Sequence, residues 1–470
     1  MRHLLVTQLH QYWWRHNMAF IGNTVQTQGF IPAVDYFSGN GSTTAFTLSR
    51  PVASVVQVEA VINNVVQDPS TAYTVSGNTL TFTSAPPSGT NNIYVRYTSL
   101  ITQVIAPSQG TVGWNQLTTD VQQDLGISFK NRIINGAMVI DQRNAGASVT
   151  PTTDGQYTVD RWGASISQAS KFSVQQNAGS VTPPAGFTNY LGATSLSAYS
   201  VLTNDYFLFQ QKIEGLNVGD LGWGTANAKT VTLSFWVRSS LTGTFGGSLN
   251  NSAINRSYPF SYTVSSANTW EQKSITIAGD TTGTWLTTNG IGLRVILSLG
   301  AGSGQSGTAG SWAGAQYLSA TGATSVVGTN GATFYITGVQ LEVGTQATTF
   351  DYRSYGTELA LCQRYFISYG GIGANDQIML ARTGGTSNAN GVVNLPVTMR
   401  TSPTVGYSSV GALTVDDNSV GNATTAIATN TGGYTSVYLN LTTAATLTTN
   451  RPALIYCTNS SSRLTWSAEL

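Results

Sequence analysis

The segment Val231-Thr-Leu-Ser-Phe-Trp-Val-Arg-Ser239 alternates apolar and polar side chains along its whole length. Successive side chains of a β-strand point to opposite faces, so this pattern predicts a strand with one apolar face. That face would carry Val231, Leu233, Phe235 and Val237, and the other Thr232, Ser234, Trp236 and Arg238. Residues 269–277, 291–297 and 332–342 have similar patterns. About ten short strands of this kind in residues 128–355 predict a two-sheet, jelly-roll-like sandwich.

Strand-like patterns also flank this region on both sides. Residues 35–102 predict a β module with one strand over 55–62 and a hairpin that turns at 76–78. Residues 356–470 open with a helix candidate over 355–365, and strand-like pieces rich in Thr and Asn follow it as a C-terminal β domain. The predicted fold class is therefore all-β, with serial β-sandwich or jelly-roll modules and a short linking helix.

Residues 103–127 are predicted to be a linker. The short linking helix lies within it, over 113–126. Its apolar residues recur at helical spacing and form one narrow stripe: Trp114, Leu117, Val121 and Leu125. A helix that buries only a narrow stripe usually packs on another element, including copies of itself. The four residues are therefore candidates for self-association.

Charge is scarce in this chain. Only 9% of its 470 residues are charged, against about 25% in ordinary soluble domains, and the net charge is +1. A nucleic-acid-binding protein would show a basic patch and a high pI, so we expect no nucleic-acid partner. The surface must consist largely of hydroxyls, amides and glycine. Recognition by such a surface should depend weakly on ionic strength, because few charges are present to be screened.

Histidine and cysteine usage restricts the chemistry further. The histidines are His3, His10 and His16, so a histidine general base or a zinc site in the main body is nearly excluded. Cys362 and Cys457 have neither CxxC spacing nor metal partners, and a disulfide framework is ruled out. We expect no enzyme activity, no metal and no cofactor.

The first 17 residues differ from the rest, because they hold every histidine and the pair Trp13-Trp14. They read either as a short amphipathic anchoring helix or as the product of an upstream start codon, with translation beginning at Met18, and the second reading is favoured. Polar residues interrupt the run Leu4-Leu5-Val6, so a signal peptide is not expected. No stretch approaches the roughly 20 apolar residues of a membrane span, so no membrane insertion is expected. The protein would be synthesised in a cytoplasm.

Tryptophans of the central region are candidates for binding a sugar ring, because exposed aromatic faces stack on the apolar faces of sugars. The candidates are Trp236, Trp270, Trp285 and Trp312. The alternative for Trp236, which falls on the polar face of its strand, is that both strand faces are covered or that it packs at a subunit interface.

Acidic residues are scattered singly, apart from the adjacent pair Asp416-Asp417 in a Ser/Gly-rich turn and the neighbours Asp154 and Asp160. The pair is a receptor-binding candidate, although neighbouring turn acids are more often caps, turn formers or calcium ligands than catalysts. A glycosidase needs two acids facing each other across a cleft, which makes hydrolysis the weaker alternative. The pattern GxGxxG at 302–307 lacks the following helix and acidic residue of a dinucleotide site, so we interpret it as a chance match.

Two stretches resemble the start and the end of a module common in tail fibre proteins of tailed bacteriophages. The first is Asn131-Arg-Ile-Ile-Asn-Gly-Ala-Met-Val-Ile-Asp-Gln-Arg-Asn144, followed by residues 157–162. The second is residues 336–344, followed by Phe350-Asp-Tyr-Arg-Ser-Tyr-Gly-Thr-Glu-Leu-Ala-Leu-Cys-Gln-Arg-Tyr-Phe366. Residues 232–237 are similar to strands of carbohydrate-binding-module jelly rolls. Residues 395–404 and 467–470 resemble fibre tips, and residues 37–46, 66–69 and 80–87 resemble a repeated module near the virion.

The resemblance implies a homotrimeric fibre in the virion tail, with Trp114, Leu117, Val121 and Leu125 as trimerisation candidates. Residues 1–34 would attach it to other tail proteins, and the distal β domains would bind a host surface glycan or outer-membrane receptor. The family has no catalytic motif to carry over. This chain lacks the extended repetitive shaft of long fibres, so a tail adaptor without a receptor role is an alternative. A polysaccharide depolymerase is a second one.

Overall fold

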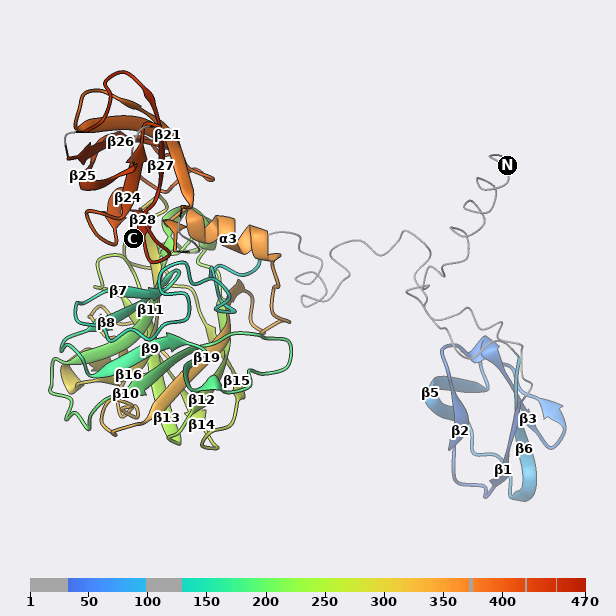
Figure 1. Cartoon of the computed structure of the whole chain (residues 1–470). Coiled ribbons are helices and arrows are strands. Elements are labelled where there is room, and N and C mark those ends of the chain that lie inside the picture. Colours follow the sequence, from blue (N-terminus) through green and yellow to red (C-terminus); the bar gives the residue numbers. More distant parts are fainter. Residues whose placement is uncertain (1–32, 99–128, 372–374, 419–420, 445) are drawn as a thin grey trace, which may run out of the picture. The chain divides into compact units, whose positions relative to one another are not determined.

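Antiparallel strands make up nearly all of the regular secondary structure in this computed structural model, which describes residues 33–98, 129–371, 375–418, 421–444 and 446–470 (Figure 1). The chain divides into two compact units, Met1–Leu117 and Thr118–Leu470. The self-association candidates Trp114, Leu117, Val121 and Leu125, and residues 1–32, lie outside the described residues. Within the described part, no helix is long and apolar enough to cross a membrane.

The first unit contains a four-stranded sheet and a two-stranded one. The four-stranded sheet runs β1 (Val34–Gly39), β6 (Gly89–Tyr97), β3 (Val58–Ile62) and β4 (Val65–Val66), and the other pairs β2 (Ala45–Val52) with β5 (Tyr73–Phe82). One apolar core lies between them, built from Leu48, Val52, Val58, Ala60, Tyr73, Leu80, Phe82, Ile93, Val95 and Tyr97. The Tyr73 hydroxyl donates to the Val58 carbonyl at 2.8 Å, which satisfies its one buried polar atom.

Two local predictions in this unit are wrong. Gly77 has a left-handed φ of 58°, yet no hairpin turns there, because β5 runs through it and pairs with β2. The predicted strand over 55–62 begins as a 3-10 turn, η1 (Val55–Gln57), and only Val58–Ile62 is extended. At Gly77 pairing with a distant strand overrides the local turn signal. At 55–57 the Gln57 amide instead donates to the Ser54 carbonyl at 3.1 Å, which closes the 3-10 turn.

The second unit contains the predicted two-sheet sandwich. Its five-stranded sheet runs β15 (Glu271–Ile277), β12 (Val231–Ser239), β19 (Thr333–Val343), β10 (Leu191–Ser195) and β9 (Phe172–Gln176). Its six-stranded sheet runs β14 (Ser257–Val264), β13 (Gly243–Asn250), β16 (Ile291–Ala301), β11 (Tyr206–Glu214), β8 (Trp162–Ile166) and β7 (Gln156–Val159). The short pair β17 (Ser306–Gly307) and β18 (Ser319–Ala320) is parallel. Four 3-10 turns lie in the connections: η3 (Ala178–Ser180), η4 (Gly215–Asn217), η5 (Gly219–Leu221) and η6 (Ser303–Gln305).

The apolar face of Val231–Ser239 lies in the core of the sandwich, as predicted. Phe235 contacts Tyr262 of the other sheet at a centroid distance of 5.0 Å, and Phe245 stacks on Phe334 at 5.8 Å. The other face of β12 is covered as well, since Thr232 is fully buried and Ser234 is 4% exposed. The Thr232 hydroxyl on this outer face donates to the Gly344 carbonyl at 2.9 Å, so the chain that follows β19 contributes to the cover.

The chain then forms the predicted short helix, α3 (Tyr355–Gln363), and continues into the C-terminal β region. The Ser354 side chain caps the helix by accepting from the Thr357 amide. A three-stranded sheet follows with the order β20 (Phe366–Gly370), β28 (Arg463–Ser467) and β23 (Thr404–Tyr407). Six further strands close into a barrel: β21 (Gln377–Thr383), β22 (Asn388–Asn394), β26 (Ser436–Thr443), β25 (Gly421–Gly432), β24 (Leu413–Asp416) and β27 (Pro452–Cys457).

Barrel closure explains how so polar a segment forms a core. Val437, Leu439 and Leu441 of β26 point inward in alternation and are fully buried. A closed sheet leaves no edge strand, so this Thr- and Asn-rich segment needs no edge protection within the barrel.

A buried polar junction connects the sandwich to the C-terminal β region next to α3, β20 and β28. Glu469 pairs with Arg143 at 2.6 Å and also with Arg161, whose side chain is 1% exposed. Nearby, Glu214 of β11 accepts from Arg364 at 2.6 Å and from the Tyr365 hydroxyl at 2.7 Å. The stretches 131–144, 157–162, 350–366 and 467–470, which were separate signals in the sequence, therefore all contribute to one set of contacts.

Candidate functional site

Two buried polar side chains of β19 fold the chain back over the sheet and create the candidate site. Gln340, which is fully buried, accepts from the Asp351 amide at 2.8 Å. Glu342, which is 1% exposed, accepts from the Thr348 amide and hydroxyl at 2.9 and 2.6 Å. Buried acceptors must find donors, so these bonds hold residues 348–353 against the sheet.

A charged cluster forms one end of the site. The Arg353 guanidinium donates to the carbonyl of Ile133 at 3.1 Å and to that of Asn131. It also lies 3.4 Å from the Glu358 carboxylate and 3.7 Å from that of Asp351. Glu358 in turn accepts from the Asn135 amide. The guanidinium therefore ties the 131–135 segment to the start of α3 through its in-plane N–H donors.

Three aromatic rings form a wall beside this cluster. Phe187 lies 5.1 Å from Phe350 and 5.5 Å from Tyr352, and the last two lie 4.9 Å apart, all between centroids. The Tyr352 hydroxyl donates to the Gly186 carbonyl at 2.9 Å, which fixes the ring while leaving it 59% exposed. A fixed, exposed aromatic ring is a suitable stacking surface for a ligand.

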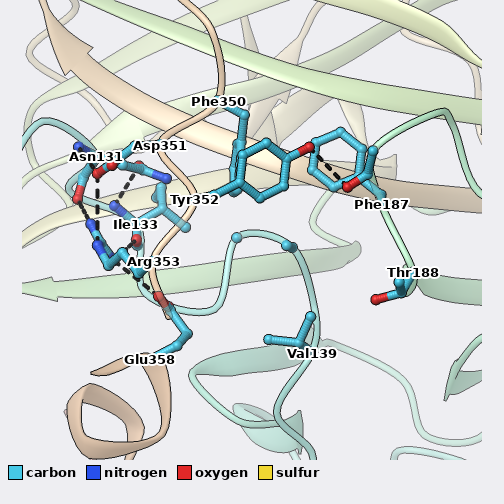
Figure 2. A pocket seen from close by; sticks show the side chains of 13 residues that line it. Asn131, Ile133, Val139, Phe187, Thr188, Phe350, Asp351, Tyr352, Arg353 and Glu358 are labelled. Carbon is cyan, nitrogen blue, oxygen red and sulfur yellow. Dashed lines mark hydrogen bonds and ion pairs between the residues drawn. The ribbon is translucent and has the colours of Figure 1, made fainter. Parts of the chain in front are cut away.

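The wall and the charged cluster enclose a cavity of about 240 Å³. Figure 2 shows the three rings on one side, Val139 opposite them, the Arg353 cluster at one end and Thr188 at the other. We call it the aromatic pocket, defined by Asn131, Ile133, Gly136, Ala137, Val139, Gly186, Phe187, Thr188, Phe350, Asp351, Tyr352, Arg353 and Glu358.

Trp236, a sequence candidate, lies close to Phe187 of the aromatic wall. A side-chain carbon on Gly338 would lie 2.6 Å from Phe187 Cζ and 3.1 Å from Trp236 Cδ1. The two rings therefore approach the same glycine, which has a left-handed φ of 60°. Trp236 is partly buried, and it packs behind the wall rather than lining the pocket.

Trp285 and Trp312 come together elsewhere, with Trp223 as their third partner. The three rings meet edge to face at centroid distances of 4.8 to 5.4 Å. Their indole N–H groups all donate within the protein: Trp223 to Lys229, Trp285 to Thr282 and Trp312 to Ala278 carbonyls. A cavity of about 160 Å³ lies beside Trp223 and Trp285. These internal bonds favour a structural role for the trio.

The remaining candidates are dispersed. Trp270 packs on Tyr190 at 5.5 Å and donates to the Thr182 carbonyl at 2.9 Å. Asp416 ends β24 and accepts from the Asn418 amide at 2.8 Å. Asp417 is 1% exposed and accepts from the Thr448 amide at 2.6 Å, so its carboxylate holds a loop and does not face solvent. Among the residues described, no three His, Cys, Asp or Glu side chains cluster as a metal site would require.

Sequence reasoning did not single out the residues of the aromatic pocket. Phe350, Tyr352 and Arg353 lay inside a stretch noted for its resemblance and were not predicted as site residues. Phe187 stands alone in a loop after Pro183-Pro184 and has no periodic pattern at all. The one available signal was the close spacing of two aromatic residues around an acidic one at 350–352.

Comparison with known proteins gives low similarities. No family model matches the chain, and no curated protein matches its sequence. Among solved structures, the enzymatically active domain of bacteriophage CBA120 tailspike protein 4 is similar at 11% identity and a TM-score of 0.26. The alignment covers 46% of this chain and only 22% of the tailspike chain.

Carbohydrate-binding modules are similar to a comparable degree. The family 11 module of Clostridium thermocellum, in complex with a β-1,3-1,4-mixed-linked tetrasaccharide, has 12% identity and a TM-score of 0.23, over 43% of this chain and 98% of the module. TmCBM61 in complex with β-1,4-galactotriose has 10% identity and a TM-score of 0.23, over 46% and 99%. The assignment as an all-β sandwich rests on the strand order of the chain itself, and these values add no argument about function.

Proposed function

We propose that this protein is a tail fibre protein of a tailed bacteriophage and that its sandwich binds a host surface glycan in the aromatic pocket. The observation that carries the proposal is the fixed wall of Phe187, Phe350 and Tyr352 beside the carboxylate of Asp351 in one cavity. An apolar ring surface beside a few polar groups is the usual make-up of a carbohydrate site.

The proposed role is binding without catalysis. A glycosidase keeps two carboxyl groups available across a cleft, one of them as a proton donor. Here the two carboxylates of the pocket, Asp351 and Glu358, both lie against the same Arg353 guanidinium. Both carboxylates are thus engaged with one cation and do not face each other across an open cleft, an arrangement that suits binding better than acid catalysis.

The wider assembly belongs to the same proposal. The protein would act as a homotrimer in the virion tail, attached to other tail proteins by residues 1–34, with the receptor-binding domains distal. The resemblance of 131–144 and 350–366 to tail fibre modules supports it. Light scattering on the full chain tests the oligomer, and a monomer under native conditions would count against a fibre. Competition for adsorption to host cells separates a receptor-binding fibre from a tail adaptor.

A glycan array followed by calorimetry with the full chain tests the pocket. Tyr352→Ala removes an exposed stacking surface, and we expect the affinity to fall about tenfold. Tyr355→Ala is the matched control, because Tyr355 is 63% exposed on the neighbouring helix α3 and does not line the pocket. Equal affinities for the wild type and Tyr352→Ala would contradict the proposed site, and no binding to any glycan would contradict the function.

A further inference from the structure

The aromatic pocket is small and closed at its charged end. Its volume of about 240 Å³ lies below the range of about 300–1,000 Å³ that is typical of sites for drug-sized ligands. Arg353 and Glu358 close one end, with side chains that are 12% and 10% exposed. A sugar chain cannot continue past these buried side chains. The pocket therefore has room for about one sugar ring, and a chain attached to that ring can leave only away from the charged end, as it does from a terminal ring.

The hydrogen-bond donors at this end are already in use. The Arg353 guanidinium donates to two backbone carbonyls and faces two carboxylates. Asp351, by contrast, keeps acceptor capacity: its closest partners are the Asn131 amide at 3.4 Å and Arg353 at 3.7 Å, and its side chain is 30% exposed. A carboxylate has about four lone-pair sites, so Asp351 can accept further hydrogen bonds from a ligand.

The net charge of the pocket lining also favours a ligand that donates hydrogen bonds to Asp351. Among the lining residues, Asp351 and Glu358 carry one negative charge each and Arg353 one positive charge, which leaves one net negative charge. A negatively charged sugar would be repelled by this net negative charge, because the only cation among the described lining residues, Arg353, already pairs with two carboxylates. A ligand that approaches with hydroxyl or ammonium groups would instead donate to Asp351.

We infer, on the basis of the proposed function, that the aromatic pocket selects one terminal sugar that is neutral or carries an amino group, and that it rejects acidic sugars. Asp351 is the specificity-determining residue, since it accepts hydrogen bonds from the ring hydroxyls. Tyr352 supplies the stacking surface.

The test is calorimetric titration of the full chain with three matched methyl glycosides: a hexose, its hexosamine and its hexuronic acid. We expect the hexose and the hexosamine to bind at least about tenfold more tightly than the hexuronate, because a desolvated like-charge contact disfavours the acid. Hexuronate binding that equals hexose binding would overturn the inference. An oligosaccharide that binds equally well with a blocked terminal ring would overturn it too.

Asp351→Asn keeps the size of the side chain and removes its charge. We expect about tenfold weaker hexose binding and a smaller penalty for hexuronate, since the amide offers one oxygen acceptor and adds a donor. Asp416→Asn is the control, because Asp416 lies on β24 and does not line the pocket. An unchanged preference in a folded Asp351→Asn variant would overturn the role of Asp351. If this variant does not fold, the wild-type ratio of hexose to hexuronate affinity decides the inference alone.

The two proposals fail differently. If Tyr352→Ala abolishes binding but wild type accepts hexuronate, the glycan-binding function stands and the selectivity is refuted. If none of the three glycosides, and no glycan of the array, binds to the wild type, both are refuted.

Discussion

Replacing Glu469 by alanine would leave two buried guanidinium groups without their counter-charge. Glu469 is 7% exposed and pairs with Arg143, which is 14% exposed, and with Arg161, which is 1% exposed. The guanidinium of Arg161 also lies 3.6 Å from the centroid of the Tyr365 ring, so it is packed on a second side. Neither arginine can lose its proton near neutral pH, so each would stay charged in a buried place.

The size of the effect follows from this burial. Breaking a buried ion pair by removing one partner costs about 3–5 kcal/mol, because an uncompensated charge stays buried. The second unit has roughly 350 residues, and an unfolding entropy of about 2.1 cal/mol/K per residue then gives roughly 0.7 kcal/mol per degree. We therefore expect Glu469→Ala to lower the melting temperature of this unit by about 4–7 °C, if it unfolds in one step.

Differential scanning calorimetry of the full chain measures this shift. Lys229→Ala is the control, because Lys229 lies 4.0 Å from Asp220 with both side chains about half exposed. Exposed pairs contribute little, so this control should change the melting temperature by less than about 1 °C. Equal melting temperatures for Glu469→Ala and the control would refute the view that these ion pairs hold the sandwich and the C-terminal segment after β28 together.

Three further predictions concern other parts of the second unit. Burial raises the pKa of Asp160 to about 7, so between about pH 4 and pH 7 the folded chain holds a proton that the unfolded chain lacks. Its stability should then fall by up to about 4 kcal/mol as pH rises through that window, and urea titrations of Asp160→Asn should show a flatter pH profile. Gly338→Ala should cost about 1–3 kcal/mol and weaken glycan binding, because the new methyl group displaces the ring of Phe187; melting and titration curves check both. Tyr365→Phe removes the hydroxyl that donates to buried Glu214 at 2.7 Å and should cost about 1.5–3 kcal/mol by denaturant unfolding, whereas a change below 0.5 kcal/mol, an approximate limit for surface sites, would speak against that bond.

Local patterns predicted much of the secondary structure. The alternation in 231–239 predicted β12 and its buried face, and the short helix over 355–365 is α3. Where the prediction is wrong, at 76–78, the sequence contains a sound turn signal at Gly77. The strand continues there because β5 pairs with β2, some 30 residues earlier in the chain. Pairing energy of this kind is not visible in a local window.

The candidate site was less accessible to sequence reasoning. Trp236 was singled out because it stands on the polar face of its strand, and it lies behind the pocket wall. Trp285 and Trp312 meet in space, but their N–H groups bond internally. The pocket is instead built by residues whose only common property is their position after folding.

By itself, the sequence determined that this chain is all-β, that it carries few charges and that histidine chemistry is absent from its main body. Each follows from composition or from two-residue periodicity, which are properties of short stretches. Only the tertiary structure decided that the C-terminal strands close into a barrel and that Phe187, Tyr352 and Arg353 share a cavity. The contact of Arg353 with Asn131 spans 222 positions, and contacts over such distances depend on how the sheets pack rather than on any local signal.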